Sequence, residues 1–373
     1  MMNKINVLLI KDSSGIFGSE RVILTLLNNY DKDRFNISLL CMRRGDGKSD
    51  KLIEQASGIG AKVIPLNVTG RLDVSAIMKI RKILKKDAIN IIHTHDFKSD
   101  FYGLAASINL PVKRIATAHG STKDSLLKKT YLLFTERFIY HFFHGIIAVS
   151  NQIHRDLRKH MSGKKVTVIQ NGIDLSILGN RGPGENQPQL FTENGKKVFA
   201  VVGRLFPDKG HRFFINAFAR VLNKFPDTAA LIVGDGPARE EIESQISKMN
   251  LVNDITLCGV RNDMNDVYEK IDFLVIPSLR EGLPYVLLEA MSKKIPVIAT
   301  SVGDIPVLIQ NEETGYLINP ADETEIEKSM LDCLVDETRA SRIADNAFNL
   351  VNQKYSGRKM VRDTESLYFS FLN

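Results

Sequence analysis

The chain has 373 residues, of which 43% are hydrophobic and 25% are charged, and it carries a formal net charge of +7. This length exceeds what one ordinary core supports, so we expect two domains. No apolar run approaches the ~20 residues that span a bilayer, so no membrane-spanning helix is expected. Three cysteines (Cys41, Cys258, Cys333) share no metal-binding spacing. They fit reduced thiols, which predicts a cytoplasmic location.

The charge is unevenly distributed along the sequence. Residues 1–175 carry 28 basic and 15 acidic side chains, a net +13, which leaves −6 for the remainder. This asymmetry predicts that the first half faces an anionic partner. Nucleic acid is not expected, because there is no aromatic-rich RNA-binding pattern, zinc knuckle or basic-region heptad. An anionic membrane surface fits better.

Short apolar runs alternate with helical patterns in both halves, which predicts parallel sheets covered by helices on both faces. The first half has strand candidates at Ile5–Ile10, Ile37–Cys41, Lys62–Pro65, Ile89–Thr94, Arg114–Ala118, Gly145–Val149 and Val166–Ile169. Its helix candidates include Ser19–Asn29, Asp50–Ser57, Val74–Lys86 and Asp100–Ile108. The second half has strand candidates at Val198–Val202, Ala229–Val233, Ile255–Leu257, Phe273–Pro277, Val297–Thr300 and Gly315–Ile318. Its helices are expected to begin near Gly210, Ala238, Met264, Pro284, Asp304 and Asp322.

The polar stretch at residues 180–189 holds two glycines and two prolines and is the best candidate for a linker. We therefore expect a first Rossmann-like domain over residues 1–180 and a second over 190–355. Residues 356–373 form a final helix.

The first half offers several candidate sites. Gly18 closes a glycine turn after the first strand, a position typical of phosphate binding. The turn lacks the full dinucleotide fingerprint, and no acidic residue ends the second strand, so a nicotinamide enzyme is not expected. His93 and His95 share a strand face but have no third ligand at a suitable spacing, so zinc is not expected. The Asp31-Lys-Asp33 sequence lies in a turn, where aspartate is common, and is not interpreted as a metal site.

The segment 121–147 is basic in its first half and aromatic in its second. Six apolar side chains follow helical spacing: Leu127, Tyr131, Phe134, Phe138, Ile139 and Phe142. Such a helix can lie in a membrane interface, beside Lys123, Lys128, Lys129 and Arg137. Alternatively, the same stripe packs on the sheet of its own domain.

Two loops of the second half carry charges suited to a nucleotide-sugar. Arg204 and Lys209 straddle a turn after the strand Val198–Val202 and could hold phosphates, one as a fork and one as a point charge. Glu281 and Glu289 lie eight positions apart across the start of a helix, with the N–H groups of Gly282 and Leu283 between them, which favours an anion. Gly234 allows a tight turn at the end of another strand.

The order and spacing of these segments resemble glycosyltransferase family 4, the retaining nucleotide-sugar transferases of the GT-B fold. The resemblance spans nearly the whole chain and includes the segments beginning at Gly18, Thr117, Ala148 and Asn171. It implies two Rossmann-like domains facing across a cleft, with the acceptor on the first and the nucleotide-sugar on the second. It also implies that the last helix crosses back to the first domain.

The resemblance further implies a role for each site residue. Arg204 and Lys209 would offset the diphosphate charge, Glu289 would take the ribose hydroxyls, and Glu281 would bind the sugar. His119 would contact the transferred sugar. The other expected contacts are Gly18, Gly234, Val260, Gly282 and Leu283 on the donor, and His95 and Asp96 on the acceptor side.

The expected activity is therefore transfer of a hexose-type sugar from a nucleotide diphosphate, uridine diphosphate first and guanosine diphosphate mannose next. The acceptor would be a glycan or lipid-linked glycan, in cell-surface polysaccharide or glycolipid synthesis. No cofactor and no metal ion are expected, and the protein would be cytoplasmic with a peripheral contact to the inner face of the membrane. Two alternatives remain: a GT-B nucleotide-sugar epimerase, and a nucleotide-sugar-binding protein without transfer activity.

Overall fold

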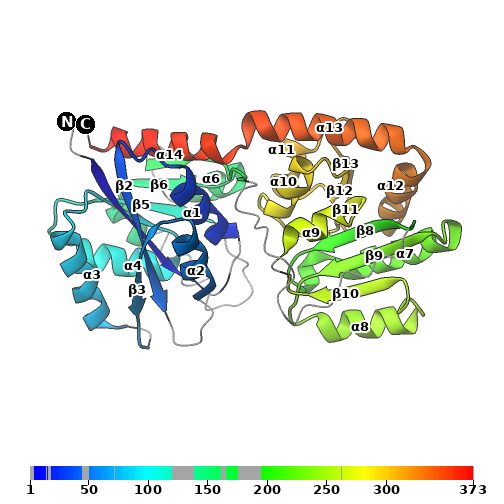
Figure 1. The fold of residues 1–373 in the computed structure, drawn as a ribbon, viewed down its shortest axis with the longest axis horizontal. Helices are drawn as coiled ribbons and strands as arrows, with labels where there is room; N and C mark the ends of the chain where they lie inside the picture. Colours follow the sequence, from blue (N-terminus) through cyan, green and yellow to red (C-terminus); the bar gives the residue numbers. More distant parts are fainter. Residues whose placement is uncertain are drawn as a thin grey trace. The chain divides into compact units, whose positions relative to one another are not determined.

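The computed structural model describes residues 4–13, 15, 18–43, 50–70, 72–119, 138–159, 161, 165–174, 195–261 and 263–372. The chain divides into two compact units. One unit comprises Met1–Gly172 with Ser356–Asn373, and the other comprises Ile173–Tyr355. The stretch 180–189, expected to be a linker, lies outside the described residues. Each unit is built on one parallel sheet with helices on its faces (Figure 1).

The first unit contains a seven-stranded sheet in the order β3-β2-β1-β4-β5-β6-β7. Its strands are β1 (Ile5–Asp12), β2 (Phe35–Arg43), β3 (Lys62–Asn67), β4 (Ile91–Thr94), β5 (Lys113–Ala118), β6 (Gly145–Ala148) and β7 (Val166–Val168). All the paired strands run parallel, so their carboxyl ends share one edge. The order reverses between β1 and β4, which is where ligands of open α/β sheets bind.

Helices flank this sheet: α1 (Gly18–Asn29), α2 (Asp50–Gly58), α3 (Val74–Lys86), α4 (Phe97–Ser107), the 3-10 turn η2 (Tyr140–Phe142) and α6 (Asn151–Arg158). Helices α3 and α4 bury one face of the sheet around Leu8, Ile10 and Tyr102. Helix α14 (Gly357–Ser370) brings the end of the chain back to this unit and packs beside α1 (Figure 1). Gly172 permits this return, because a Cβ there would lie 2.5 Å from the carbonyl oxygen of Ser356.

The second unit contains a six-stranded sheet in the order β10-β9-β8-β11-β12-β13, again parallel. Its strands are β8 (Lys197–Val202), β9 (Thr228–Val233), β10 (Ile255–Gly259), β11 (Phe273–Ile276), β12 (Val297–Thr300) and β13 (Tyr316–Ile318). Its helices are η5 (Pro207–Lys209), α7 (His211–Lys224), α8 (Arg239–Lys248), α9 (Met264–Glu269), α10 (Tyr285–Ser292), α11 (Ile305–Leu308), α12 (Glu323–Val335) and α13 (Glu337–Lys354). Two apolar cores fill the two faces, and the switch point lies between β8 and β11.

The strands match the sequence expectations, whereas some helices differ. Helices α6 and α13 were not predicted. Helix α4 begins at Phe97 rather than Asp100. The Asp96 side chain accepts from Ser99 N at 2.9 Å and Asp96 N donates to Ser99 Oγ at 3.0 Å, which caps the helix three residues earlier.

The aromatic end of the segment 121–147 does not present its apolar side chains on one face, as the helical spacing predicts. Residues 120–137 lie outside the described residues, so the basic half is not described. In the described end, Phe138 and Phe142 are 58% and 62% exposed, whereas Ile139 is buried. The predicted face is therefore split between core and solvent. No described helix has the length and apolarity needed to cross a membrane.

Candidate functional site

Two loops meet tightly at the switch point of the second unit. They follow β8 and β11, whose carboxyl ends are neighbours in the sheet. Leu279 N donates to the carbonyl oxygen of Asp208 at 2.7 Å. Gly210 has a φ of 71°, and a Cβ there would lie 2.0 Å from the carbonyl oxygen of Pro277. These contacts fix the loop of Lys209 against the loop of Glu281.

Lys209 and Glu281 form an ion pair at this point. Lys209 Nζ lies 2.5 Å from Glu281 Oε1, and the two side chains are 18% and 10% exposed. Ser278 Oγ donates to the same carboxylate oxygen at 2.8 Å. A mostly buried pair of this kind interacts more strongly than a surface pair, and it still reaches solvent. The sequence had placed both residues in one site without predicting that they contact each other.

Arg204 lies on the β8 side of the same edge. Its guanidinium carbon is 4.8 Å from the centroid of the Phe206 ring. Gly234, directly after β9, has a φ of 144°, and a Cβ there would lie 1.8 Å from the carbonyl oxygen of Gly203. Leu205 N donates to Asp235 O at 3.0 Å. The glycine therefore lets the backbone after β9 pack directly on the loop that carries Arg204.

The loop before α10 is equally constrained. Leu283 is buried, and Asp304 N donates to Gly282 O at 3.0 Å. Gly303 has a φ of 61°, and a Cβ there would lie 2.2 Å from the carbonyl oxygen of Glu281. Three close backbone approaches, at Gly210, Gly234 and Gly303, thus hold this edge of the sheet in one conformation.

Glu289 occupies a different environment from Glu281. It is fully buried on α10, and its Oε2 accepts from Tyr268 Oη at 2.5 Å. Val260, expected near the nucleotide base, is 58% exposed after β10. The neighbouring Arg261 is buried and bonded to both carboxylate oxygens of Asp263, with Nε 2.8 Å from Oδ1. Its charge is thus already compensated within the fold.

Polar side chains also gather at the carboxyl edge of the first sheet. Asp96 caps α4 and accepts from Asp12 N at 2.8 Å, and Lys11 Nζ lies 3.3 Å from Glu20 and 3.7 Å from Asp96. Burial opposes the charge of Lys11, but these carboxylates raise its pKa. Gly18 begins α1, which carries Glu20.

Three imidazoles line up beside this cluster. His95 Nδ1 lies 3.1 Å from His119 Nε2, and the His93 ring centroid is 4.2 Å from that of His95. His95 is buried, whereas His119, directly after β5, is partly exposed. Burial lowers the pKa of His93 to about 3, and burial also lowers the pKa values of His95 and His119. The three rings are therefore neutral at neutral pH.

Hydroxyl groups contact both ring nitrogens of His93. His93 Nδ1 lies 2.6 Å from Tyr368 Oη and its Nε2 lies 2.6 Å from Thr117 Oγ1, so both nitrogens are engaged by hydroxyls. Within the described part of the chain, no group of three or more His, Cys, Asp or Glu side chains is arranged to hold a metal ion. The Asp31 side chain stabilises the turn in which it lies, because its Oδ1 accepts from Asp33 N at 2.9 Å.

Sequence reasoning missed several residues of these two edges. Ser278 donates a hydrogen bond to Glu281, and Tyr268 donates one to Glu289. Tyr368 forms a hydrogen bond with His93. His211, directly after Gly210, is buried, and burial with the charge of Lys209 lowers its pKa to about 4. Serine and tyrosine at these positions have no motif spacing, so only the fold reveals them.

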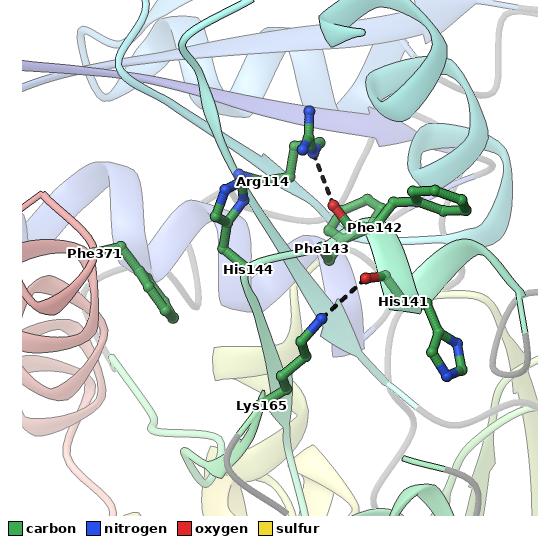
Figure 2. A pocket seen from close by; sticks show the side chains of 7 residues that line it. All are labelled: Arg114, His141, Phe142, Phe143, His144, Lys165 and Phe371. Carbon is green, nitrogen blue, oxygen red and sulfur yellow. Dashed lines mark hydrogen bonds between the residues drawn. The ribbon is translucent and has the colours of Figure 1, made fainter. Parts of the chain in front are cut away.

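A groove of about 440 Å³ lies at the opposite, amino-terminal edge of the first sheet (Figure 2). It is lined by Arg114, His141, Phe142, Phe143, His144, Lys165 and Phe371. Arg114 Nε donates to Phe142 O at 2.9 Å, and Lys165 Nζ donates to His141 O at 2.9 Å (Figure 2). The groove is basic and aromatic, and it contains none of the predicted site residues.

Comparisons with known proteins agree with this architecture. The family model "Glycosyltransferase Family 4" matches residues 16–177, and "Glycosyl transferases group 1" matches residues 184–350. The chain is 28% identical over 370 residues to the UDP-Gal:alpha-D-GlcNAc-diphosphoundecaprenol alpha-1,3-galactosyltransferase of Escherichia coli, covering 95% of this chain and 94% of the relative. It is 23% identical over 304 residues to the N-acetyl-alpha-D-glucosaminyl L-malate synthase of Bacillus anthracis, covering 80% of each.

The fold is also similar to that of a solved structure, Anabaena HepE in complex with UDP and glucose. The TM-score is 0.81 at 21% identity, covering 98% of this chain and 100% of the other. Two Rossmann-like units with these strand orders correspond to the GT-B fold. The two family models together match most of the sequence, one on each side of residue 180. The chain therefore belongs to glycosyltransferase family 4 and is a glycosyltransferase of the GT-B fold.

Proposed function

We propose that this glycosyltransferase moves a hexose-type sugar from a uridine-diphosphate donor to a glycan or lipid-linked acceptor, with retention of configuration and without a metal ion. Guanosine diphosphate mannose is the next donor to test. The observation that carries the proposal is the Lys209–Glu281 pair at the switch point of the second unit. Lys209 would supply a cation for the diphosphate and Glu281 a carboxylate for the sugar, and the two side chains are in direct contact.

When the donor binds, Lys209 would exchange its contact with Glu281 for a contact with the diphosphate. A donor diphosphate would bind Lys209 and Arg204, because the diphosphate as a whole carries more negative charge than one carboxylate. Glu281 would then be available to sugar hydroxyls, still held by Ser278. Glu289, buried and bonded to Tyr268, would present its carboxylate to the ribose from a fixed position.

The chemical step follows from the same arrangement. The acceptor oxygen would bond to the anomeric carbon on the face from which the phosphate leaves. As the bond between that carbon and the phosphate oxygen breaks, the acceptor proton would pass to the leaving phosphate. Lys209 and Arg204 would stabilise the negative charge that develops there. No protein nucleophile is required.

The acceptor is inferred from the relatives and the first unit. The name of the Escherichia coli relative specifies a sugar carried on diphosphoundecaprenol, which supports a lipid-linked acceptor and a role in cell-surface polysaccharide or glycolipid synthesis. His95 and Asp96 would bind acceptor hydroxyls and His119 the transferred sugar, because uncharged imidazoles both donate and accept hydrogen bonds.

A peripheral contact with an anionic membrane accompanies this acceptor. The net charge of +13 over residues 1–175 supports attraction to an anionic lipid surface. Lys128 and Lys129 of the segment 121–147, outside the described residues, would contribute to the attraction. The protein would then work at the inner face of the membrane.

The function is tested by incubating the protein with UDP-galactose, UDP-glucose or GDP-mannose, with and without a synthetic N-acetylglucosaminyl-diphospholipid. We expect a UDP-sugar to be consumed and an α-linked disaccharide to form, as read by NMR of the anomeric proton. A changed sugar nucleotide in the absence of acceptor would instead indicate an epimerase. Binding of the donors without turnover would indicate a binding protein.

The membrane contact is tested by co-sedimentation with vesicles rich in anionic lipid. We expect binding at low salt, and each basic residue near the surface should contribute ~1 kcal/mol over a Debye length of ~8 Å at physiological salt. Raising the salt concentration, or combining Lys128→Glu with Lys129→Glu, should weaken it. No sedimentation of wild type at low salt would favour a soluble acceptor.

A further inference from the structure

A chain of buried polar contacts runs from the last helix to the histidine pair of the first unit. Tyr368, on α14, is fully buried with its hydroxyl on His93. His93 contacts Thr117 through its other nitrogen, and Thr117 lies on β5 two residues before His119. The His93 ring also lies against His95, which is bonded to His119.

The neutrality of these rings makes the contacts directional. A neutral imidazole has one N–H and one bare nitrogen, so of the two hydroxyls on His93 one must donate and the other must accept. His95 and His119 likewise share a single proton along their 3.1 Å contact. The other nitrogen of His119, Nδ1, therefore faces a ligand as a donor when His95 donates to His119, and as an acceptor when His119 donates to His95.

Nothing about helix formation requires a hydroxyl at position 368. Tyr368 packs edge-on against Phe35, a contact that phenylalanine would preserve. A phenol buried without a partner would be destabilising, and burial already raises its pKa. The hydroxyl thus has one described partner, the His93 nitrogen, and its position is explained by that bond.

We propose that Tyr368 and His93 are positioning residues for the His95–His119 pair, so that the C-terminal helix completes the first unit's part of the active site. Tyr368 and Thr117 together set the orientation and tautomer of His93. His93 then holds His95 by ring contact and holds the strand of His119 through Thr117. The inference rests on the proposed function in taking His119 as the imidazole that contacts the sugar.

The test compares Tyr368→Phe with Tyr102→Phe. Tyr102 is also fully buried in the first unit, but its hydroxyl accepts from Asp73 N at 2.8 Å and lies outside the histidine network. With UDP-galactose and the synthetic diphospholipid acceptor, we expect Tyr368→Phe to lower kcat roughly 2- to 30-fold while the KM for the donor stays within about twofold. Tyr102→Phe should leave both parameters unchanged.

A second readout needs no substrate. In protein labelled with ¹⁵N-histidine, the ring-nitrogen shifts report the tautomer of each imidazole. We expect Tyr368→Phe to move the shifts of His93 and also of His95 or His119, whereas Tyr102→Phe moves none of them. Because this arm is independent of turnover, absent transfer by wild type would contradict the proposed function and leave the positioning role to be decided by the shifts.

Thr117 supplies variants should Tyr368→Phe fold poorly. Thr117→Val removes the second hydroxyl on His93 and should reproduce the loss of kcat and the shift changes, and Thr117→Ser should restore both. Unchanged kcat and unchanged His95 and His119 shifts in folded Tyr368→Phe, or in Thr117→Val, would overturn the proposal. Equal effects of Tyr102→Phe would overturn it as well, since the response would then be general to buried tyrosines.

Discussion

The carboxyl edges of the two sheets both lie at a reversal of strand order, but they present different side chains there. In the second unit, Lys209 and Glu281 are a charged pair held by loops whose backbones touch. In the first unit, His95 and His119 are neutral rings whose charged forms are disfavoured by burial. The second unit therefore offers a charged pair, whereas the histidines of the first unit, which lie beside the Lys11, Glu20 and Asp96 cluster, interact through hydrogen bonds.

This difference fits the two parts of a transfer reaction. A nucleotide diphosphate brings full negative charges, which require cations held at fixed positions as the leaving group departs. A sugar hydroxyl brings no charge and must be oriented, which neutral donors and acceptors do without competing for the phosphates. In the proposed function, two similar α/β units differ in their roles through a few side chains at their strand ends.

The largest effect is expected from removing the cation of the charged edge. Lys209→Ala should lower turnover about 100- to 1000-fold, because it removes a donor to charge that develops in the transition state. Lys224→Ala is the matched control, since Lys224 forms an exposed ion pair with Glu327 in the same unit. Initial rates with saturating UDP-sugar measure both. Lys209→Ala turnover close to that of Lys224→Ala would remove Lys209 from the site.

The close backbone packing at the carboxyl edge of the second sheet can be disrupted by substituting a glycine. Gly234→Ala should lower the free energy of unfolding by about 2–3 kcal/mol, because its φ of 144° is unfavourable for alanine and the new Cβ would meet Gly203 O. Gly282→Ala is the control: among the described residues, a Cβ there meets no heavy atom within 4 Å. Denaturant titration should separate the two variants, and equal stabilities would contradict the close-approach argument.

The neutrality of the histidines in the first unit can be tested through the pH dependence of the free energy of unfolding. The pKa of His93 is about 3 when folded, against ~6.5 when unfolded, so between these values the unfolded chain binds more protons. As pH falls below about 6.5, His93 alone should lower the free energy of unfolding by up to about 1.4 kcal/mol per pH unit. His93→Gln, which can still donate and accept, should flatten that slope. Denaturant midpoints between pH 7 and 4.5 test it, and parallel slopes would show that His93 titrates normally.

The smallest effect is expected from removing metal ions. Because Arg204 and Lys209 are proposed to neutralise the diphosphate, activity in excess chelator should equal activity without it. The measurement is the initial rate after dialysis against chelator, with and without added magnesium or manganese. Loss of the rate with recovery on adding either ion would show that charge at the donor is handled by metal.

Much of this fold could be predicted from the sequence, since parallel buried strands appear as continuous apolar runs. Each predicted strand is found, and Val74–Lys86 forms a helix with the predicted ends. Helix α13 was missed because it follows α12 without an intervening strand, which breaks the alternation. Asp96 is expected on the acceptor side and also caps α4 through Ser99, three residues later, which is a local capping signal in the sequence.

The candidate site was only half visible in the sequence. The motif spacing brought Arg204, Lys209, Glu281 and Glu289 into one unit, and the structure places Lys209 on Glu281. Sequence could not supply the supporting contacts, because His93 and Tyr368 are 275 positions apart and meet only when the last helix returns. Long-range packing of that kind leaves no periodic trace in one sequence.

The claim that the charged edge holds the donor diphosphate is tested most directly by calorimetric titration of UDP. Wild type and Lys224→Ala should bind with the same affinity. Lys209→Ala should bind about tenfold more weakly or worse, because it loses a charge-assisted hydrogen bond and leaves Glu281 uncompensated beside the phosphates. Equal affinity of all three proteins for UDP, with Lys209→Ala still folded, would contradict the account.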